Sequence, residues 1–209
     1  MPRHPILHGL YVVTPDDVLL PRLSAMVGSA LQGGARLVQY RNKSAPTPLR
    51  RSQAAELLRI CRASDAVLII NDDVQLTLEI GADGVHLGGE DGDLSAARKA
   101  LGPHRLLGAS CYNDLHRAEV AVRAGADYLA FGSMFSSKTK ATTVAAPLTI
   151  LTEAKRFGLP VAAIGGITVD NAPDVIDSGA DMVAVISDLF DTLDMAARVA
   201  QYQKLFQSS

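Results

Sequence analysis

Short apolar segments recur along the whole chain, and longer stretches of mixed polar and apolar residues separate them. The segment 67–71 is an apolar run, as expected of a strand that is buried on both faces. The pattern predicts strands at 10–14, 37–41, 67–71, 84–87, 106–110, 128–132, 161–164 and 182–186. It predicts helices at 49–63, 74–80, 94–101, 114–124, 171–178 and 195–206. Two further helices are predicted, one that ends at Leu31 and one that Pro147 opens. Strands and helices therefore alternate.

A tripeptide, Gly-Ala-Arg or Gly-Ala-Asp, precedes every second predicted strand. The copies begin at Gly34, Gly81, Gly125 and Gly179, which are 47, 44 and 54 residues apart. Each interval has the length of two β-strand–α-helix units, so the repeat predicts an α/β fold, a single-domain (β/α)8 TIM barrel over residues 1–209. Active sites of such barrels lie at the C-terminal ends of the strands, which makes the residues after each strand the candidates for chemistry.

Cations and acids follow the second, third and fourth predicted strands. Arg41 and Lys43 could hold a phosphate through a guanidinium fork and a point charge, although a solvated surface pair is the alternative. Asp72 and Asp91 suit Mg2+, which is usually held by one or two carboxylates, water and substrate phosphates. The neighbouring acids are assigned to helix caps at Asp73 and Asp93.

Other strand ends carry weaker signals. His86 lacks a second histidine at metal-ligand spacing, which favours a packed or hydrogen-bonded strand residue. Ser110 can hydrogen-bond a ligand, whereas Cys111 has no base near it in sequence and is interpreted as structural. Gly166 and Ser187, after the seventh and eighth strands, lie where many barrels bind a monophosphate, although a tight turn also needs glycine.

The polar loop 133–146 follows the sixth strand and contains several hydroxyl groups and two lysines. A loop of this length at a barrel mouth is often a functional lid, and a disordered surface loop is the alternative. Together with Arg41 and Lys43, Lys140 of this loop provides more positive charge than a monophosphate needs. The strand ends thus predict a diphosphate site and a separate monophosphate site, as in a transferase that expels diphosphate.

Composition narrows the class of protein. The chain has 209 residues, 48% of them hydrophobic, and a formal charge of −2, which gives no indication of a nucleic-acid partner. No apolar run approaches the length of a membrane span, and no signal peptide is recognised. Two cysteines, Cys61 and Cys111, make no disulfide framework. We expect a cytoplasmic protein that acts on small-molecule substrates and has no membrane partner. A homo-oligomer is compatible with the sequence.

Seven motifs in chain order resemble the thiamine phosphate synthase (thiamine-phosphate pyrophosphorylase) family. They are the run 39–43 (Gln-Tyr-Arg-Asn-Lys), Asn71-Asp72-Asp73, 85–91, Gly108-x-Ser110, Ser137-Lys138-Thr139-Lys140, 164–167 and 185–187. The resemblance implies that 4-amino-5-hydroxymethyl-2-methylpyrimidine diphosphate ionises and is attacked by the nitrogen of hydroxyethylthiazole phosphate or its carboxylated form. Prolines that many members carry in the loop are replaced here by Ser136, Lys138 and Ala141.

The resemblance also implies roles for individual residues. The pyrimidine diphosphate would be bound by Gln39, Arg41, Lys43, Asn71, Ser110 and Lys140, and Mg2+ by Asp72 and Asp91. The thiazole phosphate would be bound by Ser137, Thr139, Gly166, Ile186 and Ser187. The intervening Tyr40, Asn42 and Lys138 complete the candidate substrate-binding set, and Lys140, Arg41, Lys43 and Ser110 form the candidate catalytic set.

Three other interpretations stay open. A thiazole tautomerase shares the barrel but needs no metal or diphosphate site, so Asp72, Asp91 and Lys140 argue against it. A non-catalytic barrel that senses thiamine phosphates would look the same in sequence. A phosphosugar isomerase would usually want a carboxylate base on a late strand end, and Glu153 falls in a predicted helix instead.

Overall fold

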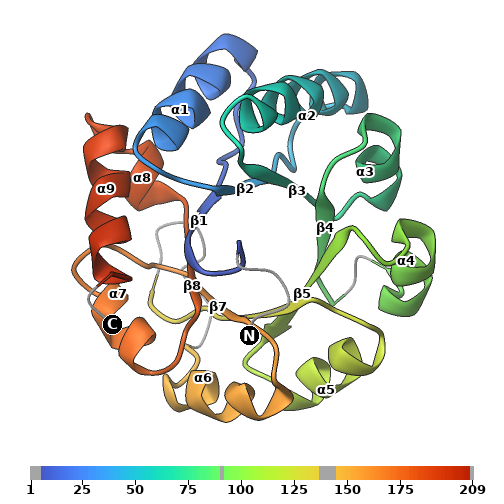
Figure 1. Cartoon of the computed structure of the whole chain (residues 1–209), viewed down its shortest axis with the longest axis vertical. Coiled ribbons are helices and arrows are strands. Elements are labelled where there is room, and N and C mark those ends of the chain that lie inside the picture. The colour runs from blue at the N-terminus through green and yellow to red at the C-terminus, as the bar shows by residue number, and fades with distance from the viewer. Residues whose placement is uncertain (1–5, 90–91, 137–144, 208–209) are drawn as a thin grey trace.

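Eight parallel strands close into a barrel in the order of the sequence (Figure 1). The structure is a computed structural model that describes residues 6–89, 92–136 and 145–207. The strands are β1 (Gly9–Val13), β2 (Leu37–Tyr40), β3 (Val67–Asn71), β4 (Gly84–Leu87), β5 (Leu106–Tyr112), β6 (Tyr128–Phe131), β7 (Val161–Ile164) and β8 (Met182–Val185). The predicted barrel is therefore confirmed, and the residues after each strand share one rim of it.

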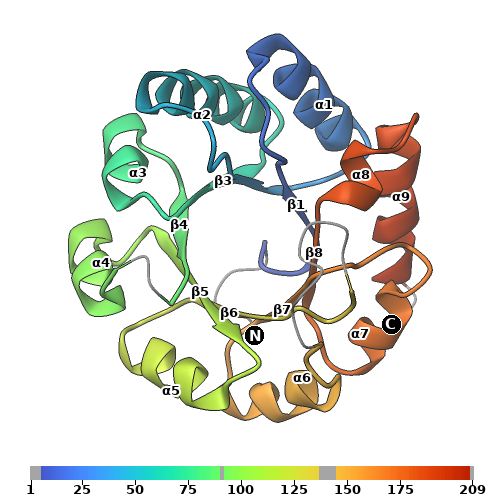
Figure 2. The ribbon, with the colours of Figure 1, turned by 180° about the vertical axis from the view of Figure 1, so that it is seen from behind.

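Helices surround the ring of strands on its outside, as both views of the barrel show (Figures 1 and 2). They are α1 (Leu20–Gln32), α2 (Thr47–Arg62), α3 (Val74–Ile80), α4 (Leu94–Leu101), α5 (Leu115–Arg123), α6 (Thr149–Ala154), α7 (Ala172–Asp177), α8 (Ser187–Phe190) and α9 (Met195–Leu205), with a 3-10 turn at Lys155–Phe157. Within the described segments, no helix is both long and apolar enough to cross a membrane.

The elements differ from the predicted ones mainly at their ends. Pro21 lies in the first turn of α1, where its missing N–H has no helical partner to lose. Pro147 precedes α6 by two residues and accepts a turn hydrogen bond from the Ile150 N–H. The short helix α8 was not predicted, because a four-residue segment shows no helical period.

The core has two layers. Apolar residues on the outward face of the strands pack under the helices, whereas a second cluster fills the inside of the barrel. Tyr11 and Tyr128 are the largest side chains of the inner cluster, and both are fully buried. Leu7 packs into the same cluster, and the segment just before β1 lies inside the ring of strands (Figures 1 and 2). It closes the end of the barrel at which the strands begin.

The Gly-Ala-Asp and Gly-Ala-Arg copies form the turns that enter β2, β4, β6 and β8, as predicted. Their glycines all have positive φ, which costs glycine little. The carboxylates of Asp83, Asp127 and Asp181 each accept the N–H of a residue at the start of the preceding strand, at 2.8 Å. The repeat therefore ties neighbouring strands together at the N-terminal rim.

Candidate active site

Asp16, in the loop after β1, contacts both basic residues that follow β2. Its carboxylate accepts a hydrogen bond from the Arg41 guanidinium at 2.9 Å and another from the Lys43 N–H at 3.1 Å. The Thr14 hydroxyl donates to the Arg41 carbonyl and accepts from the Arg41 N–H, which fixes the backbone of the same loop. The sequence analysis missed Asp16, although it too follows a strand end and could have been found by the same rule.

Lys43 and Asp72 are brought together at the C-terminal rim. The Lys43 Nζ lies 3.2 Å from Asp72 Oδ2, and the Asp72 N–H donates to the His86 carbonyl at 2.9 Å. Asp72 has a φ of 63°, a left-handed conformation that aspartate tolerates better than most residues but that still carries strain. Strain of this kind clusters at functional sites, and here it aims a carboxylate beside an ammonium group.

The acids assigned to helix caps do cap helices. Asp73 accepts from the Leu76 N–H at the start of α3, and Asp93 accepts from Ser95 and Ala96 at the start of α4. These predictions are confirmed, and the other acid at the end of β3, Asp72, lies beside Lys43 at the rim.

Tyr40 and Asn42 face away from the barrel interior, although both were included in the candidate substrate-binding run. The Tyr40 hydroxyl donates to Gln53 Oε1 of α2 at 2.8 Å, and burial raises the pKa of Tyr40. Asn42 donates to the Asp17 carbonyl and to Gln53 Oε1, and it accepts from the Ala45 N–H. The structure does not bring these two side chains to the mouth beside Arg41, and their polar groups instead shape the loop that carries it.

Three further candidates, Gln39, Asn71 and Ser110, project together with His86 from alternate positions of the strands into the barrel. Gln39 is 4% exposed and donates to the Tyr11 hydroxyl at 2.8 Å. His86 contacts the Ser110 hydroxyl at 2.8 Å, which confirms it as a hydrogen-bonded strand residue. Asn71 ends β3 beside His86 in the register of the sheet. These residues form the floor beneath the charged rim.

No group of three or more His, Cys, Asp or Glu side chains that could hold a metal ion gathers within 6–89, 92–136 and 145–207. Asp91 was predicted as a metal ligand, and it lies outside these residues. Asp72 is a partly buried carboxylate, which is the oxygen donor that Mg2+ prefers. Asp72 therefore fits Mg2+, whose remaining coordination positions are usually filled by water and phosphate oxygens.

The end of β7 meets the start of the polar loop, and the end of β8 lies beside β7. Gly166 has a φ of 62°, and a Cβ there would collide with Phe135 and with the Ser136 carbonyl. Ile186 packs on the inner cluster, and Ser187 is exposed at the first residue of α8. Glycine is thus required by close packing of the loop, and the phosphate-binding role of these three residues stays a prediction.

Both described ends of the polar loop meet at the same place. The Ala146 N–H donates to the Ser133 carbonyl at 2.7 Å, and the Phe135 N–H donates to the Gly165 carbonyl. The loop therefore leaves and rejoins the barrel at the rim between β6 and β7. Its candidate residues Ser137, Lys138, Thr139 and Lys140 lie outside the described residues.

Both cysteines are structural, as Cys111 was predicted to be. Cys61 and Cys111 are fully buried under the helices, and burial raises the pKa of each thiol to about 12. A thiol with so high a pKa forms little of the reactive thiolate near neutral pH.

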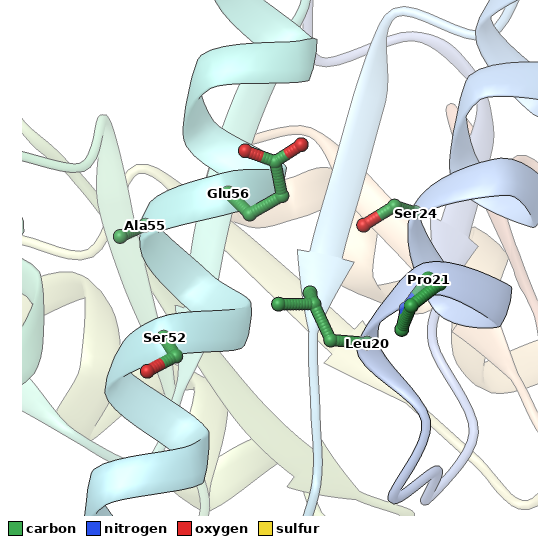
Figure 3. Close-up of a pocket in the computed structure, with 6 residues that line it drawn as sticks. All are labelled: Leu20, Pro21, Ser24, Ser52, Ala55 and Glu56. Atoms are coloured by element: carbon green, nitrogen blue, oxygen red, sulfur yellow. The ribbon is translucent and has the colours of Figure 1, made fainter.

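An open pocket of about 580 Å³ lies between α1 and α2, on the outside of the barrel (Figure 3). Its lining is small and largely apolar, and its carboxylate, Glu56, already accepts two hydrogen bonds from Arg59. The pocket lies outside the ring of strands and none of its lining residues is a candidate, so we place the candidate active site at the C-terminal rim instead.

Known proteins resemble the chain along nearly its whole length. Residues 10–189 match the family model described as thiamine monophosphate synthase. The thiamine-phosphate synthase of Aromatoleum aromaticum is 50% identical over 203 residues, 97% of this chain and 98% of that one. That of Azoarcus sp. is 52% identical over 202 residues, 96% of this chain and 98% of that one.

A solved structure agrees with these sequences. The thiamine phosphate pyrophosphorylase from Pyrococcus furiosus superposes with a TM-score of 0.85 at 35% identity, covering 97% of this chain and 96% of that one. The family model, the relatives and the barrel structure agree. The chain therefore belongs to the thiamine monophosphate synthase family.

Proposed function

We propose that the protein is a thiamine-phosphate synthase, a transferase that joins a pyrimidine diphosphate to a thiazole phosphate. The observation that carries this proposal is the charged cluster at the ends of β2 and β3, where Arg41 and Lys43 are held by Asp16 beside Asp72. Two cations and a metal-type carboxylate at one rim suit a diphosphate better than a monophosphate. The relatives carry the corresponding name.

The substrates we propose are 4-amino-5-hydroxymethyl-2-methylpyrimidine diphosphate and hydroxyethylthiazole phosphate or its carboxylated form. The pyrimidine ring would lie over Gln39, Asn71 and Ser110, with its diphosphate toward Arg41 and Lys43. The thiazole phosphate would lie toward Gly166 and Ser187. Support comes from the barrel order, since β7, β8, β1 and β2 are consecutive, so Gly166 and Ser187 lie on the same rim as Arg41 and Lys43.

In the proposed reaction the bond between the pyrimidine methylene carbon and the diphosphate oxygen breaks first, and its electrons leave with diphosphate. The thiazole nitrogen then donates its lone pair to the methylene cation. Arg41 and Lys43 favour this step because negative charge grows on the oxygen they contact. Mg2+, which Asp72 and Asp91 would hold, would supply further neutralisation of the diphosphate charge.

The direct test is turnover by the purified protein. Thiamine phosphate and diphosphate should appear when both substrates and Mg2+ are present, and neither product should form when one substrate is omitted. Removal of the metal with EDTA should stop the reaction, and added Mg2+ should restore it. Binding of both substrates without any product would contradict the proposal and favour a sensor, whereas conversion of a thiazole phosphate alone would favour a tautomerase.

A further inference from the structure

A continuous chain of hydrogen bonds crosses the inside of the barrel and links two candidate substrate-binding residues. Gln39 Nε2 donates to the Tyr11 hydroxyl at 2.8 Å, and the Tyr11 and Tyr128 hydroxyls are 2.7 Å apart. The Tyr128 hydroxyl lies 3.0 Å from His86 Nδ1, and His86 Nε2 lies 2.8 Å from Ser110 Oγ. Five strands, β2, β1, β6, β4 and β5, each contribute one residue to this chain.

The direction of every bond in the chain follows from its first donor. An amide nitrogen can only donate, so the Tyr11 hydroxyl accepts from Gln39, and Tyr128 is the only other described group to which it can give its own hydrogen. Tyr128 then donates to His86 Nδ1, which leaves the ring hydrogen of neutral His86 on Nε2. His86 therefore donates to Ser110 Oγ, and the Ser110 hydroxyl keeps its own hydrogen for another acceptor.

The two ends of the chain consequently differ in character. Within the described part of the chain, Gln39 Oε1 accepts no hydrogen bond, and it is not among the buried unpartnered atoms. An acceptor is thus available on Gln39 and a donor on Ser110. A planar heteroaromatic ring with an amino group and a ring nitrogen offers the matching donor and acceptor.

The barrel is built around this chain. Gly108 of β5 faces the interior, and a Cβ at that position would collide with the Tyr128 ring and with His86 Nδ1. The absence of a side chain is therefore what lets these two groups meet. Tyr11 and Tyr128 are 1% and 0% exposed, and burial raises the pKa of both, so both hydroxyls keep their protons.

We propose that Tyr11, Tyr128 and His86 are positioning residues that hold Gln39 as an acceptor and Ser110 as a donor toward the aminopyrimidine ring. This proposal rests on the proposed function, since it deepens the recognition of one of its substrates. Tyr11 and Tyr128 do not touch the ligand themselves. They act by fixing the hydrogen positions of the residues that do.

The first measurement is the ring-nitrogen NMR of His86 in the protein without ligand, assigned by comparison with a His86→Gln variant. We expect the neutral tautomer with hydrogen on Nε2. The opposite tautomer would overturn the proposal, because the chain would then run in the reverse direction and Ser110 would donate to His86. This measurement needs no turnover by the enzyme.

The second measurement is calorimetric binding of the pyrimidine diphosphate to Tyr128→Phe, which cuts the chain in its middle. We expect the dissociation constant to rise about tenfold, the loss of roughly one hydrogen bond of binding free energy, and the His86 tautomers to mix. Tyr11→Phe, which frees the Gln39 amide to turn over, should have a similar effect and serves if Tyr128→Phe does not fold.

The matched control is Tyr202→Phe, which removes a buried hydroxyl bonded at 2.8 Å to Asp188, between α9 and α8 outside the barrel. It should lower thermal stability comparably and leave pyrimidine diphosphate binding unchanged. Equal affinity in Tyr128→Phe and wild type would overturn the positioning role. Failure of the wild-type protein to bind the pyrimidine diphosphate would instead contradict the proposed function, whatever tautomer His86 has.

Discussion

Two arginines, one at each rim of the barrel, use their guanidinium groups in opposite ways. At the N-terminal rim, Arg98 donates to the carbonyls of Gly125, Gly102 and Arg105 and pairs with Asp127. At the C-terminal rim, Arg41 donates its guanidinium, within the described residues, to Asp16 alone. A guanidinium has five N–H donors. Arg98 uses most of them on groups of the fold, whereas most of those of Arg41 have no described acceptor, as the proposed diphosphate site requires.

The acids of the two rims differ in the same way. Asp83, Asp127 and Asp181 each accept a backbone N–H of the preceding strand, and Asp127 and Asp181 also pair with Arg98 and Lys155. Asp72 carries its side chain beside Lys43 on strained backbone. The carboxylates of the N-terminal rim are fixed to the backbone of a strand, which stabilises the barrel. We expect the Asp72–Lys43 pair, by contrast, to exchange partners when a substrate or a metal binds.

The sharpest test of this comparison is Arg41→Ala. We expect kcat/KM for the pyrimidine diphosphate to fall about a thousandfold, or about 4 kcal/mol, because a charge-assisted contact to the leaving group is lost. The melting temperature should stay within a degree or two of wild type. Arg59→Ala, which removes an exposed arginine paired with Glu56, is the control and should leave kcat/KM unchanged. A large fall in stability with Arg41→Ala would erase the distinction between the rims.

Asp72→Gly should separate activity from stability at a single position. Activity in Mg2+ should fall about a hundredfold, since the carboxylate is lost from the rim. The free energy of unfolding should stay level or rise by about 1 kcal/mol, because glycine adopts the φ of 63° without strain. Steady-state kinetics and urea unfolding measure the two effects. Wild-type turnover in this variant would show that Asp72 is not a metal ligand.

Arg98→Ala should give the reverse of Arg41→Ala. We expect the free energy of unfolding to fall by about 2–3 kcal/mol, because three carbonyls and Asp127 lose their donor. The kcat measured well below the melting temperature should be that of wild type. Arg98→Lys keeps one charge and part of the hydrogen bonding, so its loss should be smaller. If Arg98→Ala lowered kcat while folded, the N-terminal rim would have a role in the reaction.

Neighbouring acids permit a smaller test of the same kind. Asp73→Ala removes the cap of α3 and should cost about 1 kcal/mol of stability with normal activity. Asp73→Ser retains a capping oxygen and should recover most of that loss. Urea denaturation and a turnover assay are enough for both variants. A loss of Mg2+-dependent activity in Asp73→Ala would mean that the metal ligand at this strand end was assigned to the wrong aspartate.

Little effect on turnover is expected at the two cysteines, which are buried under the helices. Because burial raises the pKa of Cys61 and Cys111 to about 12, a thiol reagent at pH 8 should label neither in the folded protein. Both should react once the protein is unfolded in urea. Cys111→Ala should keep turnover within about twofold of wild type, at a stability cost of about 1–2 kcal/mol. Rapid labelling of native Cys111, measured by mass spectrometry, would contradict its structural role.

Much of the fold and part of the candidate site could be predicted from local sequence patterns. Apolar segments placed all eight strands to within two residues, and Asp73 and Asp93 identified two helix starts. The Gly-Ala copies identified the turns of the N-terminal rim, because each copy satisfies its neighbours along the chain and in the adjacent strand. The strand-end rule brought Arg41, Lys43 and Asp72 to one rim, since parallel strands all end on the same side.

Other features depend on partners far apart in sequence. Asp16 accepts a hydrogen bond from Arg41, which is 25 residues away in sequence, and the hydroxyls of Tyr11 and Tyr128 bond across 117 residues. The Tyr40 hydroxyl donates to Gln53 of α2. By itself, the sequence determined the barrel, its rims and the charged residues placed there, because strand period and chain order are local properties. Only the tertiary structure decided which hydrogen bonds orient those residues, because closing the barrel is what brings donors and acceptors from different strands within reach.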